Sequence, residues 1–483
     1  MYWSAQNLRQ VTGGRWQTAP SITTTLTGVA IDSRTIRKGQ VFVAIKGDGF
    51  DGHDFVAQAA ESGAAMAIVC EDRSYPVSLP VLFVEDTIGT LGTLADTYRN
   101  HLRRGSTRVI AVTGSNGKTT TRNLIHTVLS AKYAGTQSPR SFNNHLGVPL
   151  TILNASPNDD FIVVEVGSNH PGEIASLARI VSPDAAVITN VGAAHIGHFD
   201  SEDAIAREKT ALLDSLTANG LALLGGDEPT RSLVEPLIQT LPETIRTIWF
   251  GQSESNDLYF PACSTDAMGS TFATGDGLQV KLGLLGRHNV TNALAAVAVG
   301  RWFEMDDQTI SAALETVRPL PMRLDVKQIG DGSLSLTLIN DAYNANPASM
   351  ARALAVLREY PRPHSEGRRV AILGDMFELG DRGAKEHCRL AHLLDRCYDD
   401  EPILAVFIGS LTRHTAEILR DQWPPECVRH FPELDETVTD QIAELLGPSD
   451  VVMLKASRGM ALERLVPAIE RRVANFEEHL IRQ

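Results

Sequence analysis

Hydrophobic runs along the chain alternate with helix-like patterns and divide it into three stretches. Up to about residue 105 the apolar runs are short, and those at 28–31, 40–45 and 81–84 predict strands. The spacing of apolar residues over 55–64 predicts a helix between them. We therefore expect residues 1–105 to form a small N-terminal α/β domain.

The second and third stretches carry longer runs that are apolar at nearly every position. Residues 106–319 contain RVIAVTG, DFIVVEVG, AAVITNVG and LALLGG, and residues 320–483 contain LTLIND, RRVAILGD, ILAVFIGS and DVVMLKAS. Such runs are typical of parallel strands with helices on both faces of the sheet. The pattern predicts a central parallel-sheet domain and a C-terminal Rossmann-like domain, with linkers at 317–323 and 100–108.

Composition narrows the functional classes. The 483 residues suit three domains of about 150 residues each, and a net charge of −14 offers no overall basic field for nucleic acid or an anionic membrane surface. The five cysteines show no CxxC spacing, which indicates reduced thiols and a cytoplasmic location. No targeting segment is evident, and no apolar run reaches membrane-spanning length.

A glycine-rich loop stands between the first strand of the central domain and a helix pattern. It runs from Gly114 to Thr119, with the sequence GSNGKT. Backbone N–H groups of such a loop can surround phosphate oxygens, Lys118 adds a positive charge, and the Thr119 hydroxyl can bind Mg²⁺. The full G-x-x-x-x-G-K-T spacing is absent, since residue 112 is Val. We predict a shortened nucleotide-phosphate loop in a central ATPase-like domain.

A second glycine pattern, G-x-G-x-x-G at 47–52, carries less weight. Its two aspartates would repel a pyrophosphate, and no ribose-binding acid ends a following strand. We expect a plain turn there, or a loop near some other nucleotide, in preference to a dinucleotide site.

Polar residues also occur where the pattern calls for apolar ones. Glu165 ends a buried-looking strand and needs a cationic partner or a metal. His195 follows the next strand, at the sheet edge where α/β folds bind ligands, whereas His198 is assigned to loop packing or to support of the site.

Lys209 shares a helix face with Ile205 and Leu213. A buried ammonium there would need a carboxylate, a lowered pKa or covalent modification. Alternatively, the side chain extends past the apolar stripe to solvent, and periodicity alone leaves both open.

In the third stretch, polar loops follow three strands, at 341–347, 374–380 and 455–459. Strand ends of this kind line one rim of a sheet, and we expect that rim to face the phosphate loop when the domains close.

Together these motifs resemble the Mur ligases. TGSNGKTTT, EVGSNHPGEI, NVGAAHIGHFDS, REKTALL, GRHNVTNALAA, PMRLDV, NDAYNANPASM, GDMFELG and KASRGM occur in the family's order, and the similarity runs from about residue 28 to 465. In the last motif Ala456 replaces the glycine usual in the family.

The resemblance implies an activity. The carboxylate of UDP-N-acetylmuramoyl-tripeptide would take the ATP γ-phosphoryl group, and the amine of D-alanyl-D-alanine would attack the acyl phosphate, in peptidoglycan precursor synthesis. Residues 1–105 would bind the UDP-muramoyl substrate, 106–319 ATP, and 320–483 the incoming amine. We expect a monomer.

The resemblance also assigns site residues. The ATP contacts would be Gly114, Ser115, Asn116, Gly117, Lys118, Thr119, Thr120, His288, Asn289, Asn292, Arg323, Asp341 and Tyr343. Of two Mg²⁺ ions, one would lie on Thr119 and Glu165 and one on His195, with carbamylated Lys209 as their anionic partner; Lys118, Lys209 and His195 would be catalytic. The substrate contacts would be Ser33, Arg34, Asn143, Asn144, Ser168, Asn344, Lys455, Ser457 and Arg458.

Two other classes of function remain. A muramyl ligase that adds diaminopimelate or lysine, or a folylpolyglutamate synthetase, would share the central loop and metals, so that only the amine or acceptor separates them. A P-loop nucleotide switch is a non-enzyme alternative, against which stand the missing first glycine and the lack of a basic track for nucleic acid.

Overall fold

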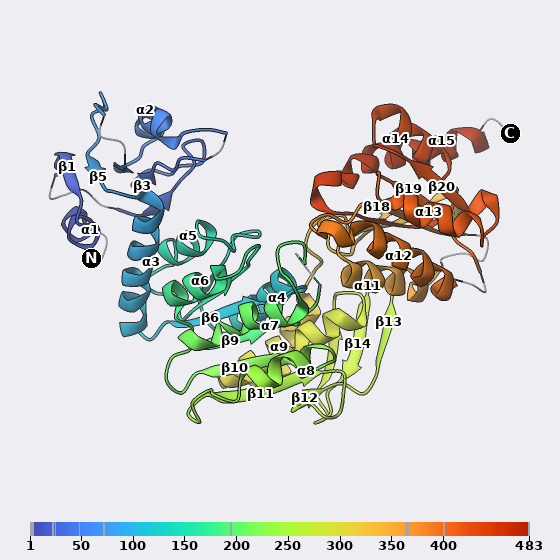
Figure 1. The fold of residues 1–483 in the computed structure, drawn as a ribbon, viewed down its shortest axis with the longest axis horizontal. Helices are drawn as coiled ribbons and strands as arrows, with labels where there is room; N and C mark the ends of the chain where they lie inside the picture. The colour runs from blue at the N-terminus through green and yellow to red at the C-terminus, as the bar shows by residue number, and fades with distance from the viewer. Residues whose placement is uncertain are drawn as a thin grey trace.

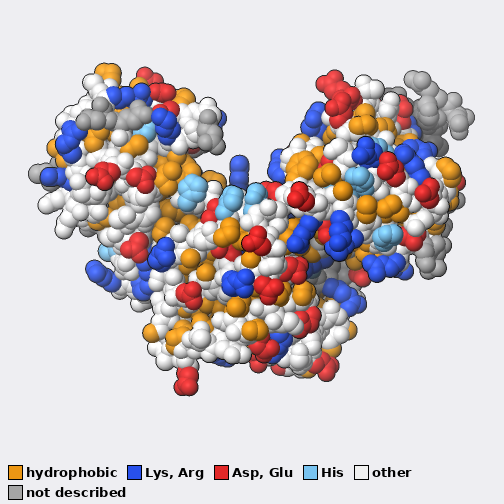
Figure 2. Space-filling view, viewed as in Figure 1, with side chains coloured by type: hydrophobic (Ala, Val, Ile, Leu, Met, Phe, Trp, Pro, Cys, Tyr) orange, Lys and Arg blue, Asp and Glu red, His pale blue; other side chains and the backbone are white. Residues whose placement is uncertain are grey.

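The computed structural model describes residues 4–21, 24, 26–47, 49–70, 73–193, 196–362, 367–398 and 401–481. Three α/β units form an open arc, with the N-terminal and C-terminal units standing apart on either side of the central one (Figure 1). The space-filling view shows a notch between the two outer units, with charged and histidine side chains around its floor (Figure 2). Among the described residues, no helix is long and apolar enough to cross a bilayer.

The N-terminal unit is built on a five-stranded sheet of order β1-β5-β4-β3-β2. Its strands are β1 (Arg15–Thr18), β2 (Gly28–Ala30), β3 (Gln40–Val43), β4 (Met66–Val69) and β5 (Val81–Phe83), and its helices are α1 (Ala5–Thr12), α2 (Val56–Glu61) and α3 (Thr87–Arg104). β1 is antiparallel to β5, and the other pairs are parallel. The three predicted strands and the predicted helix are therefore confirmed.

Two segments of this unit, 100–108 and 47–52, test predictions made from the sequence. The expected linker at 100–108 is wrong in its first half, because residues 100–104 form the last turns of α3, whose buried Tyr98 and Leu102 pack into the shared core. At 47–52, the Gly47 N–H donates to Phe50 O at 3.0 Å, which closes a turn as predicted. Asp48 lies outside the described residues.

The central unit has a seven-stranded, all-parallel sheet of order β12-β11-β10-β9-β6-β8-β7. The strands are β6 (Arg108–Thr113), β7 (Gly135–Gln137), β8 (Phe161–Glu165), β9 (Ala185–Ile188), β10 (Leu221–Gly225), β11 (Arg246–Gly251) and β12 (Leu258–Tyr259). Every residue of β8, β9 and β10 is buried, because helices cover both faces. That burial explains the continuous apolar runs.

The helices of this unit are α4 (Lys118–Ser130), α5 (Gly147–Leu153), α6 (Glu173–Val181), α7 (Glu202–Thr210), α8 (Thr230–Val234), α9 (Arg287–Trp302) and α10 (Asp307–Thr316). A three-stranded antiparallel sheet, β13 (Cys263–Asp266), β14 (Gly269–Ala273) and β15 (Gln279–Leu282), was not predicted. Its strands are only four or five residues long and none of them is buried throughout, so no long apolar run marks them.

The C-terminal unit has a six-stranded sheet of order β16-β17-β21-β18-β19-β20, in which only the β16–β17 pair is antiparallel. The strands are β16 (Asp325–Ile329), β17 (Leu336–Asn340), β18 (Arg369–Gly374), β19 (Leu404–Ile408), β20 (Val428–Phe431) and β21 (Val451–Lys455). The helices are α11 (Pro347–Glu359), α12 (Gly383–Tyr398), α13 (Thr412–Arg420), α14 (Glu436–Glu444) and α15 (Val466–Ile481). The three polar loops follow β17, β18 and β21, which are neighbours in the sheet, so the loops share one edge as predicted.

Candidate active site

The glycine-rich loop joins β6 to α4 in a conformation that only glycine accommodates. Gly114 and Gly117 have φ of 144° and 82°, and a Cβ on Gly114 would lie 2.0 Å from Thr189 Oγ1. Gly117 is the N-cap of α4 and supplies no side-chain cap, so that the first N–H groups of the helix are left for a ligand. Such an arrangement suits the binding of an anion at a helix N-terminus.

Lys118 is held inside this loop. Its Nζ donates to Gly114 O at 2.7 Å. Burial lowers the pKa of Lys118 from its usual value; the nearby carboxylate of Glu165 opposes this effect, and Arg323 adds to it. The ammonium is thus poorly solvated, and a phosphate would be a better partner for it than one carbonyl.

Glu165 is buried at the end of β8 and is incompletely paired. Its Oε1 accepts from Asn143 Nδ2 at 2.8 Å, while Oε2 lies 3.5 Å from Arg122 Nη1 and has no hydrogen-bond partner among the described residues. The predicted cationic partner is therefore Arg122. A buried carboxylate oxygen with free lone pairs fits a Mg²⁺ ligand, since oxygen donors are what this ion prefers.

The sequence prediction missed Arg122, although a signal for it exists. It lies three residues before Ile125, on the same buried stripe of α4, where a charged residue requires a partner. Its Nη1 also donates to the carbonyls of Ser138 and Arg140, which fixes the loop that carries Asn143.

Lys209 is buried, which rules out the alternative of a side chain that reaches solvent. It is 3% exposed, and its Nζ donates to Ser168 Oγ at 2.9 Å. Burial, and then repulsion by Lys118, lower the pKa of Lys209 to about 7, against the attraction of Glu208 and Glu173. Near neutral pH, a large fraction of this amine is uncharged and nucleophilic, as addition of CO₂ requires.

Two histidines, His195 and His198, follow β9 in the sequence. His195 lies outside the described residues. The ring of His198 packs against that of His170, with 4.7 Å between centroids, which agrees with a role in loop packing.

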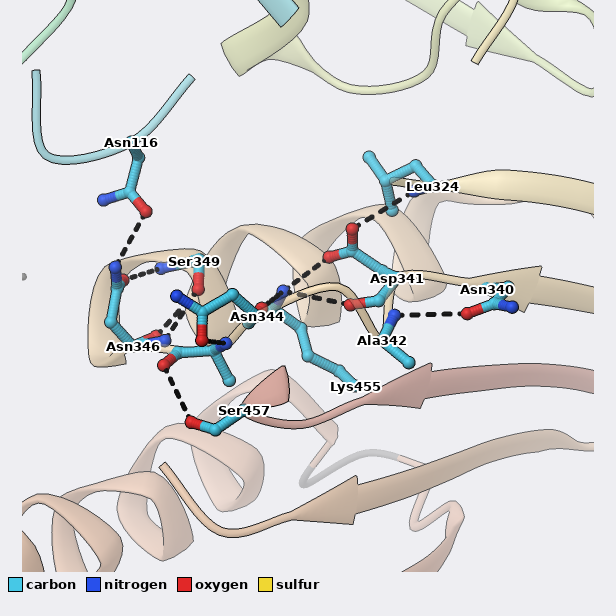
Figure 3. Close-up of polar contacts among 11 residues, drawn as sticks. Asn116, Leu324, Asn340, Asp341, Ala342, Asn344, Asn346, Ser349, Lys455 and Ser457 are labelled. Carbon is cyan, nitrogen blue, oxygen red and sulfur yellow. Dashed lines mark hydrogen bonds and ion pairs between the residues drawn. The ribbon is translucent and has the colours of Figure 1, made fainter. Parts of the chain in front are cut away.

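Three side-chain hydrogen bonds join the phosphate-loop region to the C-terminal unit. Asn346 Nδ2 donates to Asn116 Oδ1 at 2.8 Å (Figure 3), and Arg323 Nη2 donates to Thr119 Oγ1 at 3.0 Å. The hydroxyls of Ser141 and Tyr343 lie 2.5 Å apart, and the Arg323 guanidinium stands 3.9 Å above the Tyr343 ring. The rim of the C-terminal sheet therefore faces the phosphate loop, as predicted.

Between the two units lies a cavity of about 350 Å³. The predicted site residues on its wall are Ser115, Asn116, Gly117, Lys118, Thr119, Thr120, Asn143, Asn144, Glu165, Ser168, His288, Asn289, Asn292, Arg323, Asp341, Tyr343, Asn344 and Lys455. Gly114 and Lys209 do not line the cavity, but each is hydrogen-bonded to a residue that does, Lys118 and Ser168 respectively. Segments of both units thus come together as the sequence predicts.

A second cavity of about 650 Å³ adjoins the first. The two share Asn116, His288, Asn292 and Arg352, and the second reaches the loops that follow β9 and β10. Burial, and then the charges of Arg352 and Lys455, lower the pKa of His288 to about 3, so this imidazole is neutral at physiological pH.

The side chain of Lys455, which is predicted to contact the substrate, is almost completely buried. It is 2% exposed, and its Nζ donates to Asp341 Oδ2 at 2.6 Å and to Asn344 O at 2.9 Å (Figure 3). Next to it, Ala456 is fully buried, and a Cβ on Gly374 would come within 2.7 Å of its methyl group. Gly374 on the neighbouring strand therefore makes room for the residue that replaces the family's glycine.

Four predicted substrate residues do not line either cavity. Ser457 is buried and accepts from the Phe377 N–H at 2.8 Å, and Arg458 forms an ion pair with Glu463 at 2.7 Å. In the N-terminal unit, Ser33 Oγ donates to Gln58 Oε1 at 2.8 Å and Arg34 pairs with Asp32 at 2.7 Å.

Comparison with known proteins agrees with this geometry. Residues 25–99 match the model described as Mur ligase family, catalytic domain; residues 112–300 match the Mur ligase middle domain; and residues 322–458 match the Mur ligase, glutamate ligase domain. The chain belongs to the Mur ligase family.

Several Mur ligases resemble it along nearly their whole length. The UDP-N-acetylmuramoyl-tripeptide–D-alanyl-D-alanine ligase of Bacillus subtilis is 35% identical, with 96% of this chain and 97% of the relative covered. A crystal structure of MurF from Acinetobacter baumannii gives a TM-score of 0.81 at 30% identity, over 97% of this chain and 99% of that one. MurF ligase from Thermotoga maritima, solved in complex with ADP, gives 0.74 at 27% identity, over 94% and 98%.

Proposed function

We propose that the protein is an ATP-dependent ligase that adds D-alanyl-D-alanine to UDP-N-acetylmuramoyl-tripeptide through an acyl phosphate, in peptidoglycan precursor synthesis. One observation carries the proposal. A phosphate loop and a buried carboxylate with free lone pairs line one cavity, and a buried lysine with a lowered pKa donates a hydrogen bond to Ser168 on its wall, in a chain 35% identical to a ligase of that name.

ATP binding follows from the loop. The N–H groups at the start of α4 and the Lys118 ammonium would hold the β- and γ-phosphates. The adenosine would extend past Asn116 toward His288 and Asn292, where the second cavity provides room. Because His288 is neutral, it can accept or donate a hydrogen bond to the base without adding charge.

The residues present fit Mg²⁺. Thr119 Oγ1 and Glu165 Oε2 would hold one ion, and Thr119 would exchange its bond from Arg323 for the metal. Carbamylated Lys209 and His195 would serve a second. When bound, the ions neutralise charge on the transferring phosphoryl group.

The acceptor carboxylate would reach the γ-phosphate from the side of Asn143, Asn144 and Ser168, which line the cavity. The dipeptide amine would enter from the C-terminal unit, along Asn344 and Lys455, which line the cavity, and near Ser457 and Arg458. Ser33 and Arg34 would bind the uridine nucleotide. In this division residues 1–105 bind the UDP-muramoyl substrate, 106–319 ATP and 320–483 the amine.

The N-terminal and C-terminal units stand apart across the notch (Figure 2), so both substrates would enter before the outer units close on them.

All five cysteines are free thiols, which supports a cytoplasmic location for this step, where ATP is available.

The test is a purified-enzyme assay that offers UDP-muramoyl acceptors with D-alanyl-D-alanine, meso-diaminopimelate or L-glutamate, and a folate with L-glutamate. We expect ADP release and a new amide only with the tripeptide acceptor and D-alanyl-D-alanine, and hydroxylamine should trap the acyl phosphate. Turnover with a folate and glutamate alone would reject the proposal, and ATP hydrolysis indifferent to acceptor and amine would favour a nucleotide switch.

A further inference from the structure

Helix α6 begins without a cap of its own. Its N-cap, Gly172, has no side chain and a φ of 87°. Glu173, in the first turn, folds back instead to accept from the Asn169 N–H at 2.7 Å. Because the first N–H groups of a helix have no partner within it, those of Gly172 and Ile174 require an acceptor from elsewhere.

Glu208 of α7 supplies that acceptor. Its Oε2 accepts from the Gly172 N–H at 2.7 Å and its Oε1 from the Ile174 N–H at 2.8 Å. The side chain is buried, and both carboxylate oxygens are directed at the positive end of α6. A charge-assisted pair of this kind is among the stronger hydrogen-bond arrangements in proteins.

The next residue of α7 holds the other end of the same loop, since Lys209 Nζ donates to Ser168 Oγ at 2.9 Å. Two consecutive residues of one helix therefore fix residues 168 and 172. Gly167, Ser168 and Asn169 line the first cavity, whereas Glu208 lies on the wall of neither cavity.

We propose that Glu208 is a positioning residue of the ligase, which holds the 168–172 loop on α7 so that Ser168 on the cavity wall and Lys209 Nζ, which donates to it, keep their positions. The inference rests on the proposed role of Lys209. A displacement of about 1 Å at such a group can lower turnover about a hundredfold. We call the two hydrogen bonds from Gly172 and Ile174 to Glu208 the clamp, and its loss would permit such a displacement.

The chemistry of the clamp explains why a carboxylate stands there. A glutamine at 208 has the same shape but only one acceptor oxygen, and its NH₂ group would face one of the two N–H donors. An aspartate keeps the charge, but it is one methylene shorter and cannot reach both donors from the same backbone position.

The experiment compares Glu208→Gln and Glu208→Asp with the matched control Glu436→Gln, an exposed glutamate in the C-terminal unit. Each protein is acetylated with a trace of acetic anhydride in the absence of substrates, and the labelling of each lysine is read by mass spectrometry. In Glu208→Gln we expect labelling of Lys209 to rise several-fold, while the exposed Lys327 and Lys385 label as in the wild type. Glu208→Asp should give an intermediate increase, and the control should give none.

Kinetics provide the second readout. In Glu208→Gln we expect kcat to fall about tenfold to a hundredfold, with the KM for ATP within about twofold of the wild type, since the phosphate loop is untouched. Unchanged labelling of Lys209 would overturn the proposal, and so would a fall in kcat that only follows the folded fraction measured by circular dichroism. Absence of ligation in the wild type would instead refute the proposed function, because the labelling result does not depend on turnover.

Discussion

The central and C-terminal units both place polar loops at the ends of parallel strands, but they treat buried charge differently. In the central unit, Glu165 Oε2 has no hydrogen-bond partner among the described residues and Lys209 has a lowered pKa. In the C-terminal unit, Asp375 accepts from the N–H groups of Leu411 and Thr412, and Lys455 donates to Asp341 and Asn344.

This difference separates a ligand site from a structural clasp, by which we mean a polar loop whose buried groups pair with one another, as Lys455 does with Asp341 and Asn344. A buried polar group normally satisfies its hydrogen-bonding capacity within the protein, because an unmet donor or acceptor costs about 1–3 kcal/mol. The clasped loops of the C-terminal unit meet this requirement internally. The central unit retains unmet capacity where ATP, Mg²⁺ and the acceptor would bind, so variants in the two units should fail in different ways.

The largest effect is expected for Lys209→Ala. Removing the buried amine should lower ligation about a hundredfold to a thousandfold, because the proposed carbamate on Lys209, as anionic partner of the metal ions, could no longer form where charge develops. Added acetate or formate should restore part of the rate, as measured by ADP release. Lys385→Ala, at an exposed lysine, is the control. Full activity of Lys209→Ala would remove this lysine from the site.

In the clasped unit, Lys455→Met should act on stability. Asp341 and the Asn344 carbonyl lose their donor, and breaking a buried pair of this kind costs about 3 kcal/mol. Hydrogen–deuterium exchange of the β17 and β21 peptides measures the loss within the C-terminal unit. The double variant Lys455→Met/Asp341→Asn should recover part of it, and unchanged exchange rates would show that the clasp is dispensable.

A smaller effect is expected for Thr119→Ala. If the hydroxyl is a Mg²⁺ ligand, the Mg²⁺ concentration for half-maximal activity should rise about tenfold. Thr119→Ser keeps the hydroxyl and should titrate like the wild type. Identical Mg²⁺ curves for the alanine and serine variants would count against a ligand role.

The smallest effect concerns Arg458→Ala. Its ion pair with Glu463 is partly exposed, so the free energy of unfolding should change by less than about 1 kcal/mol. If the guanidinium binds the dipeptide, the KM for D-alanyl-D-alanine should rise about fivefold, the value of one exposed charge-assisted contact. Arg413→Ala on α13, which also removes a surface ion pair, should leave that KM unchanged.

Features confined to a few consecutive residues were predictable. The strand–loop–helix order around the phosphate loop follows from neighbouring residues, and the structure confirms it. The antiparallel strands β13 to β15 were missed because they are only four or five residues long and contain no continuous apolar run, as is also true of many surface loops. The prediction of a linker is wrong for the first half of 100–108, because the charged residues there belong to a helix whose other face is buried.

The pairing of polar and charged groups that are distant in the sequence could not be predicted in this way. Arg323 reaches Thr119 across 204 positions of sequence, and Glu208 caps α6 from 34 and 36 residues away. No local pattern encodes such pairs, since they depend on how separately formed elements pack.

The order of residues along the chain was thus enough to specify the long buried strands, the glycine-rich loop between β6 and α4, and the apolar face on which Lys209 lies. Whether that lysine would be buried, and that Glu165 would meet Arg122 while keeping one oxygen free, was settled by packing. The physical reason is that strand and helix patterns depend on neighbouring residues, whereas burial and charge pairing depend on which distant surfaces come into contact.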